Sequence, residues 1–245
     1  MIPLRDANPV RRTPVVTIAI IVACIVAFAY RLGLDQTGGG SAAGDAYFEQ
    51  YGLVPAHLTA ALASGRDVGG QVLNVLTSMF LHVSLIHLGG NLIFLWIFGN
   101  NIEDRLGRLP FVAFYVLGGA TAALAQVAID PTSQIPMVGA SGAISAILGT
   151  YIVLYPGARV LSLVFLVFFY QLIEVPAWMY LGVWFVLQLI DGLGSLGLAG
   201  SQGGVAFFAH IGGFLAGVAV GLVIRGGGRG RGERVRRSPA GLGVG

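Results

Sequence analysis

The chain has 245 residues, of which 56% are hydrophobic and 10% are charged. A soluble globular domain has about 45–50% apolar and about 25% charged residues, so this composition excludes a water-soluble surface. Many of the apolar residues form runs close to the ~20 residues that cross the hydrocarbon core of a bilayer, and this predicts a polytopic membrane protein. The single cysteine, Cys24, excludes an intramolecular disulfide and a cysteine metal site.

The first apolar run covers residues 15–34 and contains one charge, Arg31, near its end. An arginine at that depth reaches the membrane interface with its long side chain. Two processing signals are alternatives: a secretory signal peptide that ends at residues 27–29, and a lipoprotein box at residues 21–24. Because the chain stays apolar through Tyr30, we favour a retained membrane span.

Two connecting segments have features of their own. Residues 35–71 are mixed in polarity and too long for a turn, so we expect them to fold on one side of the membrane. The amphipathic stretch 51–62 suits a position on the membrane surface. Residues 160–173 are apolar but too few for a span. Their β-branched and aromatic content favours an interfacial hairpin or a re-entrant segment.

Five further spans follow from the remaining apolar runs, at about residues 84–106, 109–129, 137–155, 177–191 and 205–224. Ser84 is a suitable N-cap, and Pro110 suits a first helical turn. Together with residues 15–34 these runs predict an all-α fold, a polytopic six-helix membrane bundle. A disordered Arg/Gly tail is predicted over residues 225–245.

The arginines predict the orientation of the bundle. All 14 basic residues are arginines, and a six-span count puts 12 of them on one side and only Arg31 and Arg66 on the other. Positively charged loops face the cytoplasm, so residues 1–14 and 225–245 are both predicted to be cytoplasmic at the cell membrane. A seventh span would move the arginines of the tail to the other side and remove the asymmetry.

Three polar side chains mark the start of the second span. His82, His87 and Asn91 form the pattern HxxxxHxxxN. Residues 87 and 91 are four apart, so they project from one helix face, one turn from each other. Polar groups within spans are costly, and they indicate a functional site. Hydrogen bonding between helices is the alternative interpretation.

A serine opens the fourth span. Residues 139–142 read Gly-Ala-Ser-Gly, and the small neighbours leave the Ser141 hydroxyl accessible. The first amides of a helix have no partners within the helix and stabilise developing negative charge. Taken alone, this serine fits equally well a hydrogen bond back to the preceding turn of its own helix.

A histidine lies inside the last span beside a ladder of glycines. His210 is followed by Gly213, Gly217 and Gly221 at four-residue intervals, which permits the close approach of another helix. The fourth span carries a matching face of small residues, Gly142, Ser145 or Ala146, and Gly149. Packing of the two faces would bring His210 toward Ser141, the arrangement of a base and a nucleophile in acyl transfer.

Together these patterns resemble the rhomboid family of intramembrane serine proteases, in its bacterial type. The resemblance extends from about residue 74 to residue 224. It rests on four motifs in the family's order: HxxxxHxxxN, Gly99…Glu103-x-Arg105-x-Gly107, GASG and AHxxGxxxG. Each motif alone is weak, but four in this order are specific to the family.

The resemblance implies a role for each polar side chain. Ser141 would be the nucleophile and His210 the base of a dyad without a catalytic aspartate. His87, Asn91 and the Ser141 amide would form the oxyanion hole, and His82 would brace the loop before the second span. Two positions depart from the family pattern. Leu73-Asn74 replaces a Trp-Arg pair of some members, and Ser145 replaces an aromatic ring that stacks on the catalytic histidine.

The implied activity is cleavage of a peptide bond in or beside a substrate's transmembrane helix, without metal or cofactor. The expected partners are transmembrane-helix substrates and the lipid bilayer, and no nucleic acid. Ser141 and His210 lie near the starts of helices separated by one intervening span, so both helices begin at one membrane face, as a dyad requires. A catalytically silent relative that binds membrane helices is the alternative, and a transporter is the third hypothesis.

Overall fold

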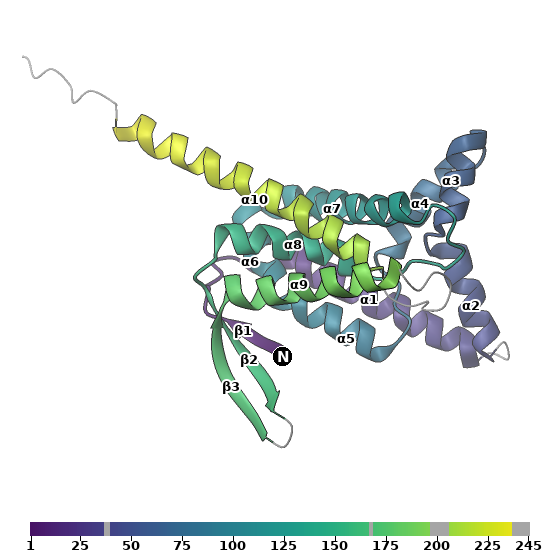
Figure 1. The fold of residues 1–245 in the computed structure, drawn as a ribbon, viewed down its shortest axis with the longest axis horizontal. Helices are drawn as coiled ribbons and strands as arrows, with labels where there is room; N and C mark the ends of the chain where they lie inside the picture. The colour runs from purple at the N-terminus through teal and green to yellow at the C-terminus, as the bar shows by residue number, and fades with distance from the viewer. Residues whose placement is uncertain (37–39, 167–168, 197–205, 237–245) are drawn as a thin grey trace, which may run out of the picture.

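The computed structural model describes residues 1–36, 40–166, 169–196 and 206–236. Figure 1 shows long helices lying side by side, with a small β-sheet projecting from one end of the bundle. The predicted helical membrane bundle is confirmed, and the sheet is a feature that the all-α prediction did not contain.

Within the described residues, five helical stretches are long and apolar enough to cross a bilayer. They are α1 (Val15–Leu34), the continuous run of α5 (Leu85–Phe94), η2 (Leu95–Gly99) and α6 (Asn100–Leu106), α7 (Arg108–Ile129), α9 (Ala177–Leu196) and α10 (Phe207–Arg236). Each lies over one of the apolar runs. The Ser84 hydroxyl oxygen accepts a hydrogen bond from the His87 amide and so caps the start of α5.

The helix over the fourth apolar run, α8 (Ser141–Leu154), is shorter and the most enclosed. It has 14 residues, and every residue from Ala143 to Tyr151 is buried. α8 begins four residues later than the span predicted from Met137, because Met137 pairs with Leu53 in an isolated antiparallel bridge and Gly139 has a φ of 129°. A helix that is buried on all sides forms the core of a bundle.

The connection after α1 folds into three short helices. They are α2 (Gly40–Tyr51), α3 (Pro55–Ser64) and α4 (Val68–Ser78). The amphipathic stretch 51–62 falls mostly on α3, which begins with proline at its first turn. In Figure 1 these helices lie at the end of the bundle opposite the sheet, so the segment folds at one end of the bundle. This agrees with the prediction that it is too long for a turn.

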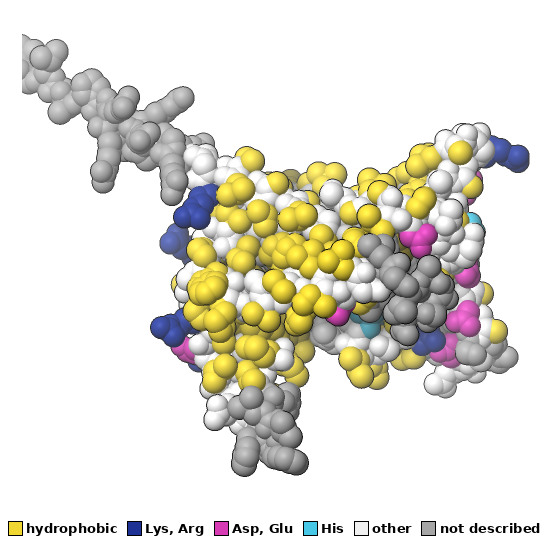
Figure 2. Space-filling model, in the orientation of Figure 1, with side chains coloured by type: hydrophobic (Ala, Val, Ile, Leu, Met, Phe, Trp, Pro, Cys, Tyr) yellow, Lys and Arg dark blue, Asp and Glu magenta, His cyan; other side chains and the backbone are white. Residues whose placement is uncertain are grey.

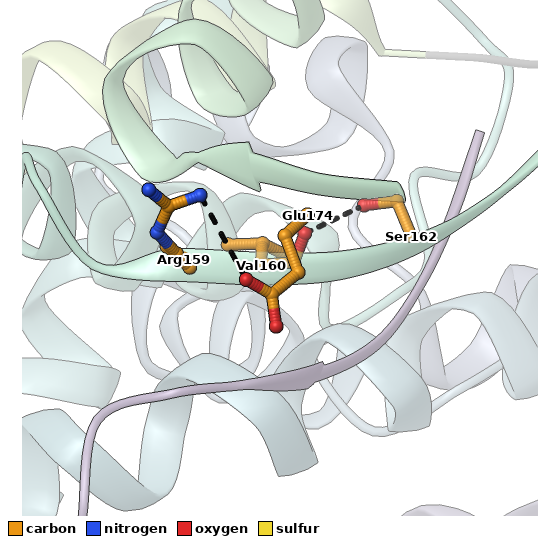
Figure 3. Close-up of polar contacts among 4 residues, drawn as sticks. All are labelled: Arg159, Val160, Ser162 and Glu174. Atoms are coloured by element: carbon orange, nitrogen blue, oxygen red, sulfur yellow. Dashed lines mark hydrogen bonds and ion pairs between the residues drawn. The ribbon is translucent and has the colours of Figure 1, made fainter. Parts of the chain in front are cut away.

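The described residues of the stretch 160–173 form two paired strands, which agrees with the hairpin, one of the two predicted alternatives. β2 (Arg159–Leu166) pairs antiparallel with β3 (Phe169–Pro176). At the base of the hairpin Arg159 forms an ion pair with Glu174 at 3.8 Å (Figure 3). The Ser162 hydroxyl donates a hydrogen bond of 3.3 Å to the Val160 carbonyl.

The N-terminal segment joins the same sheet. β1 (Ile2–Asp6) pairs antiparallel with β2, with Ile2 opposite Leu163. The Asp6 carboxylate accepts hydrogen bonds from the Tyr151 hydroxyl and the Asn101 amide. Residues 1–14, predicted only as a cytoplasmic segment, are therefore partly folded against the end of α8.

A glutamate from the motif after the second span holds the start of α1. The Glu103 carboxylate accepts hydrogen bonds from the backbone N–H groups of Val16 (3.0 Å) and Thr17 (2.8 Å) and from the Thr17 hydroxyl (2.8 Å). The side chain of Pro14, which precedes α1, supplies no cap. A buried carboxylate thus satisfies the first amides of the helix and complements its dipole.

The last helix extends beyond its predicted end at Ile224. α10 continues to Arg236, into the stretch predicted as a disordered tail. The rest of the predicted tail, residues 237–245, lies outside the described residues. Figure 2 shows arginine side chains gathered at the end of the bundle where α10 leaves it, and most acidic side chains toward the other end.

Candidate active site

The serine and the histidine singled out in the sequence meet at the starts of two neighbouring helices. Ser141 is the first residue of α8, and His210 lies in the first turn of α10. The Ser141 Oγ lies 2.8 Å from the His210 Nε2. A hydroxyl at this distance donates its proton to an unprotonated ring nitrogen, which is the ground-state contact of a nucleophile with its base.

Glycines bring the two helices into backbone contact, on the faces that the sequence predicted. A Cβ on Gly217 would overlap the Ala146 carbonyl, and a Cβ on Gly149 would overlap the Phe214 carbonyl. The Thr150 hydroxyl adds a hydrogen bond of 2.8 Å to the Gly217 carbonyl. Because the separation of α8 and α10 is fixed by backbone atoms, the separation of Ser141 and His210 is fixed as well.

The two other polar residues of the predicted site lie beside the loop that leads into Ser141. An ideal Cβ on Gly139 would lie 2.8 Å from the His87 Nε2 and 3.6 Å from the Asn91 Nδ2. The Asn91 side chain is 8% exposed, and its Nδ2 makes no hydrogen bond within the described part of the chain. A buried amide donor without a partner is costly, so this side chain is a candidate to bind a ligand oxygen.

His82 lies behind this group. Its side chain is 1% exposed, its ring centroid lies 5.0 Å from that of His87, and its Nδ1 lies 3.2 Å from the Phe80 carbonyl. Burial, with a smaller contribution from His87, lowers the pKa of His82 to about 4, although the Phe80 carbonyl acts in the opposite direction. His82 is therefore neutral at pH 7 and is bonded to the loop before α5.

Two residues that the sequence reasoning missed hold the other side of His210. The Gln188 Oε1 lies 2.6 Å from the His210 Nδ1, and the Trp184 ring centroid lies 6.1 Å from that of His210. Both residues come from α9. Ser145 does not take part, because its hydroxyl bonds to the Ser141 carbonyl at 2.7 Å. The signal for Gln188 was available, since a polar side chain within a predicted span indicates a function.

A small cavity of about 40 Å³ opens beside Ser141. Its lining is dominated by small side chains, among them Ser78, Gly119, Ala122, Gly142 and Ala209, with Met79 as a larger member. The Ser141 hydroxyl, the His210 imidazole, a buried amide donor and a small cavity therefore lie together at one end of α8. This set of groups is suited to acyl transfer with a small side chain next to the reacting carbonyl.

This chain is similar to known proteins over the region that holds these motifs. A family model described as "Rhomboid domain" matches residues 69–227. Rhomboid protein 1, mitochondrial, from Saccharomyces cerevisiae is 29% identical over 65% of this chain and 44% of its own length. Rhomboid protease GluP from Bacillus subtilis is 31% identical over 62% of this chain and 27% of its own length.

A third relative, presenilin-associated rhomboid-like protein A, mitochondrial, from Danio rerio, is 33% identical over 60% of this chain and 36% of its own length. The chain thus spans less than half the length of each of these relatives. The family model covers well over half of the chain and all four motifs, so this chain belongs to the rhomboid family.

Proposed function

We propose that this chain is an intramembrane serine endopeptidase that cleaves peptide bonds in or near transmembrane helices of membrane-protein substrates. The observation that carries the proposal is the 2.8 Å contact between the Ser141 Oγ and the His210 Nε2 at the starts of α8 and α10. Membership of a family that includes a named protease supports it.

In the proposed reaction the Ser141 oxygen attacks the substrate carbonyl carbon while its proton passes to the His210 Nε2. The C–N bond then breaks, and His210 returns that proton to the leaving amine. A water molecule then attacks the acyl-enzyme carbonyl and gives its proton to the His210 Nε2. The ester C–O bond breaks, and His210 returns the proton to the Ser141 oxygen. The small cavity beside Ser141 suits a substrate with a small residue next to the cut.

Negative charge develops on the carbonyl oxygen in both steps. The Asn91 amide, the His87 side chain and the Ser141 backbone amide are the proposed donors to it. The Asn91 Nδ2 is buried and free of other partners within the described residues, so it needs no reorganisation to receive an oxyanion. The N-terminus of α8 contributes its unpartnered amides and the positive end of its dipole.

The protein is a multi-pass membrane protein, and we propose that it lies in the cell membrane with both termini cytoplasmic. The support is the 12 to 2 distribution of arginines between the two sides and their clustering at the end where α10 leaves the bundle. Two of the three relatives named above carry "mitochondrial" in their names, and such membranes are the competing location.

The test uses the purified chain in liposomes with a model single-span substrate. Wild type is expected to cleave it, and Ser141→Ala and His210→Ala are expected to be inactive. Asn91→Ala is expected to lower kcat by about 10²–10³-fold, the cost of removing one oxyanion donor.

Ser145→Ala is the matched control, because this serine lies one turn from Ser141 and bonds only within its own helix. It is expected to retain full activity. Cleavage that survives Ser141→Ala would refute the serine mechanism. Wild type that binds the substrate helix and never cuts it would support the catalytically silent alternative.

A further inference from the structure

We infer that Gln188 is a positioning residue that selects the tautomer and the orientation of His210, in the place where serine hydrolases commonly use a carboxylate. This inference rests on the proposed function, since it assigns a partner to the proposed base. It also explains how the histidine is held in a chain that has serine at position 145.

The geometry engages both ring nitrogens of His210. The Nε2 lies 2.8 Å from the Ser141 Oγ, and the Nδ1 lies 2.6 Å from the Gln188 Oε1. A carbonyl oxygen only accepts hydrogen bonds, so the Nδ1 must carry the proton and the Nε2 must present its lone pair to Ser141. This is the tautomer that a general base needs, because the lone pair faces the hydroxyl that is to lose its proton.

The opposite orientation of the Gln188 amide would defeat the base. Its NH₂ group would then donate to the Nδ1, the proton would sit on the Nε2, and Ser141 would face a donor with no acceptor for its own proton. The amide oxygen and nitrogen are chemically distinct in this role, although they are similar in shape. The direction of the hydrogen bond between the His210 Nδ1 and the Gln188 amide can therefore be tested by experiment.

Trp184 acts on the same ring from one helical turn earlier. Residues 184 and 188 are four apart on α9, so they lie on one helix face, and both contact His210. The Trp184 ring also lies 6.0 Å from that of Phe214, one turn after His210 on α10. The three groups thus come from three helices. Ser141 lies on α8, His210 lies on α10, and Gln188, which accepts the hydrogen bond of the Nδ1, lies on α9.

The acceptor is a neutral amide and not a carboxylate. Among the described residues no carboxylate contacts His210. His87 on α5 is the titratable side chain that interacts with it electrostatically. Asp191, three residues after Gln188 on α9, is exposed. A neutral acceptor orients the imidazole but stabilises the imidazolium less than a carboxylate does. Replacing Gln188 by glutamate would therefore keep the acceptor and change the pH range of activity.

The experiment compares wild type with Gln188→Leu and Gln188→Glu in proteoliposomes, with a single-span substrate and with a fluorophosphonate probe of the serine. Gln188→Leu is expected to lower kcat by about 10- to 100-fold, the usual cost of an outer-shell partner, with KM within about twofold of wild type. At high pH the kcat of Gln188→Glu is expected to be closer to that of wild type than the kcat of Gln188→Leu. As the pH is lowered, the activity of Gln188→Glu should be lost at a higher pH than that of wild type, because the added negative charge favours the protonated imidazole.

Leu187→Ala is the matched control, since Leu187 is the preceding residue on α9 and is 50% exposed. It is expected to match wild type in kcat and in pH profile. A Gln188→Leu enzyme with wild-type kcat would overturn the inference. So would a Gln188→Glu enzyme whose pH profile coincides with that of wild type, because a charge placed at a merely structural position would leave the profile unmoved.

A second readout does not depend on catalysis. The chain has only four histidines, so ¹⁵N NMR of labelled protein resolves the ring nitrogens of His210, assigned by its loss in His210→Asn. Wild type should show a protonated Nδ1, and Gln188→Leu should show a mixture of tautomers. Failure of the proposed function appears as cleavage in Ser141→Ala or no cleavage in wild type, whereas failure of this inference alone appears as an active wild type with no Nδ1 proton preference.

Discussion

α10 packs against two of its neighbours, α8 and α9, in opposite ways. The contact with α8 is made by glycines of both helices. Gly217 of α10 lies against the Ala146 backbone, and Gly149 of α8 lies against the Phe214 carbonyl of α10. Against α9, α10 uses large rings, with Phe185 stacked on Phe214 at a centroid distance of 4.4 Å and an angle of 20°. The first contact leaves no space for adjustment, and the second is made of side chains that can repack.

The difference follows the surroundings of the two helices. The middle of α8 is buried throughout, whereas six apolar side chains of α9 are at least half exposed: Trp178, Val183, Val186, Leu187, Ile190 and Leu193. α9 is therefore a peripheral helix of the bundle, with lipid as its other neighbour. We call the glycine contact of α8 with α10 the rigid contact and the aromatic contact of α9 with α10 the adaptable contact. The rigid contact holds Ser141 and His210, whereas Gln188 comes from the helix of the adaptable contact.

Gly217→Ala is the sharpest way to break the rigid contact. The new methyl group would overlap the Ala146 carbonyl, so α10 must move away from α8. We expect the free energy of unfolding to fall by about 3 kcal/mol. Cleavage should fall by at least about 10²-fold, because a displacement of about 1 Å costs that much. Thermal unfolding in detergent and cleavage of a single-span substrate measure the two effects.

The matched variant lies on α9. A Cβ on Gly182 meets no atom within 4 Å, so Gly182→Ala adds a methyl group in open space. We expect unchanged cleavage and a gain of about 0.5–1 kcal/mol in the free energy of unfolding, since alanine loses less backbone entropy in a helix. Equal damage from both variants would show that the two helix contacts do not differ in rigidity.

The rigid contact was predictable from the sequence, and the adaptable one was not. Four-residue spacing of Gly213 and Gly217 defines a face by helix periodicity alone, and the span count brings that face to α8. The helix rotation that turns Gln188 toward His210 depends on how the rings of Trp184 and Phe185 pack, and periodicity carries no such information. A polar residue within a span can be recognised in the sequence, but the residue that it contacts depends on tertiary structure.

The ends of the bundle show the same limit. The β-branched and aromatic content of residues 160–173 favoured a hairpin or a re-entrant segment, but the pairing of β1 with β2 joins residues more than 150 positions apart in the chain. The late start of α8 has a similar cause, because Met137 is held out of the helix by Leu53. Local pattern therefore predicted the elements, and long-range backbone pairing decided where two of them begin.

Phe185→Ala tests the adaptable contact with a smaller expected effect. Removing the ring that stacks on Phe214 should lower the free energy of unfolding by about 1–2 kcal/mol, from the lost aromatic pair and its packing. Because Gln188 lies one turn further along α9, we also expect a modest fall in kcat, smaller than that of Gln188→Leu. Leu187→Ala, on the exposed side of α9, serves as the control for both measurements. A loss in Leu187→Ala as large as in Phe185→Ala would mean that α9 is not held by its rings.

Thr150→Val probes the rigid contact with the smallest expected effect. The substitution keeps the shape of a fully buried side chain and removes only its hydrogen bond to the Gly217 carbonyl. Such bonds between membrane helices are worth about 0.6 kcal/mol on average, and we expect a loss of this size in the free energy of unfolding. Thr121→Val is the control, because the exposed Thr121 hydroxyl bonds to the Leu117 carbonyl of its own helix. If glycine contact and not hydrogen bonding fixes the separation of α8 and α10, Thr150→Val will leave cleavage unchanged while Gly217→Ala abolishes it. A large loss of cleavage in Thr150→Val would instead assign the rigidity of this contact to the hydrogen bond.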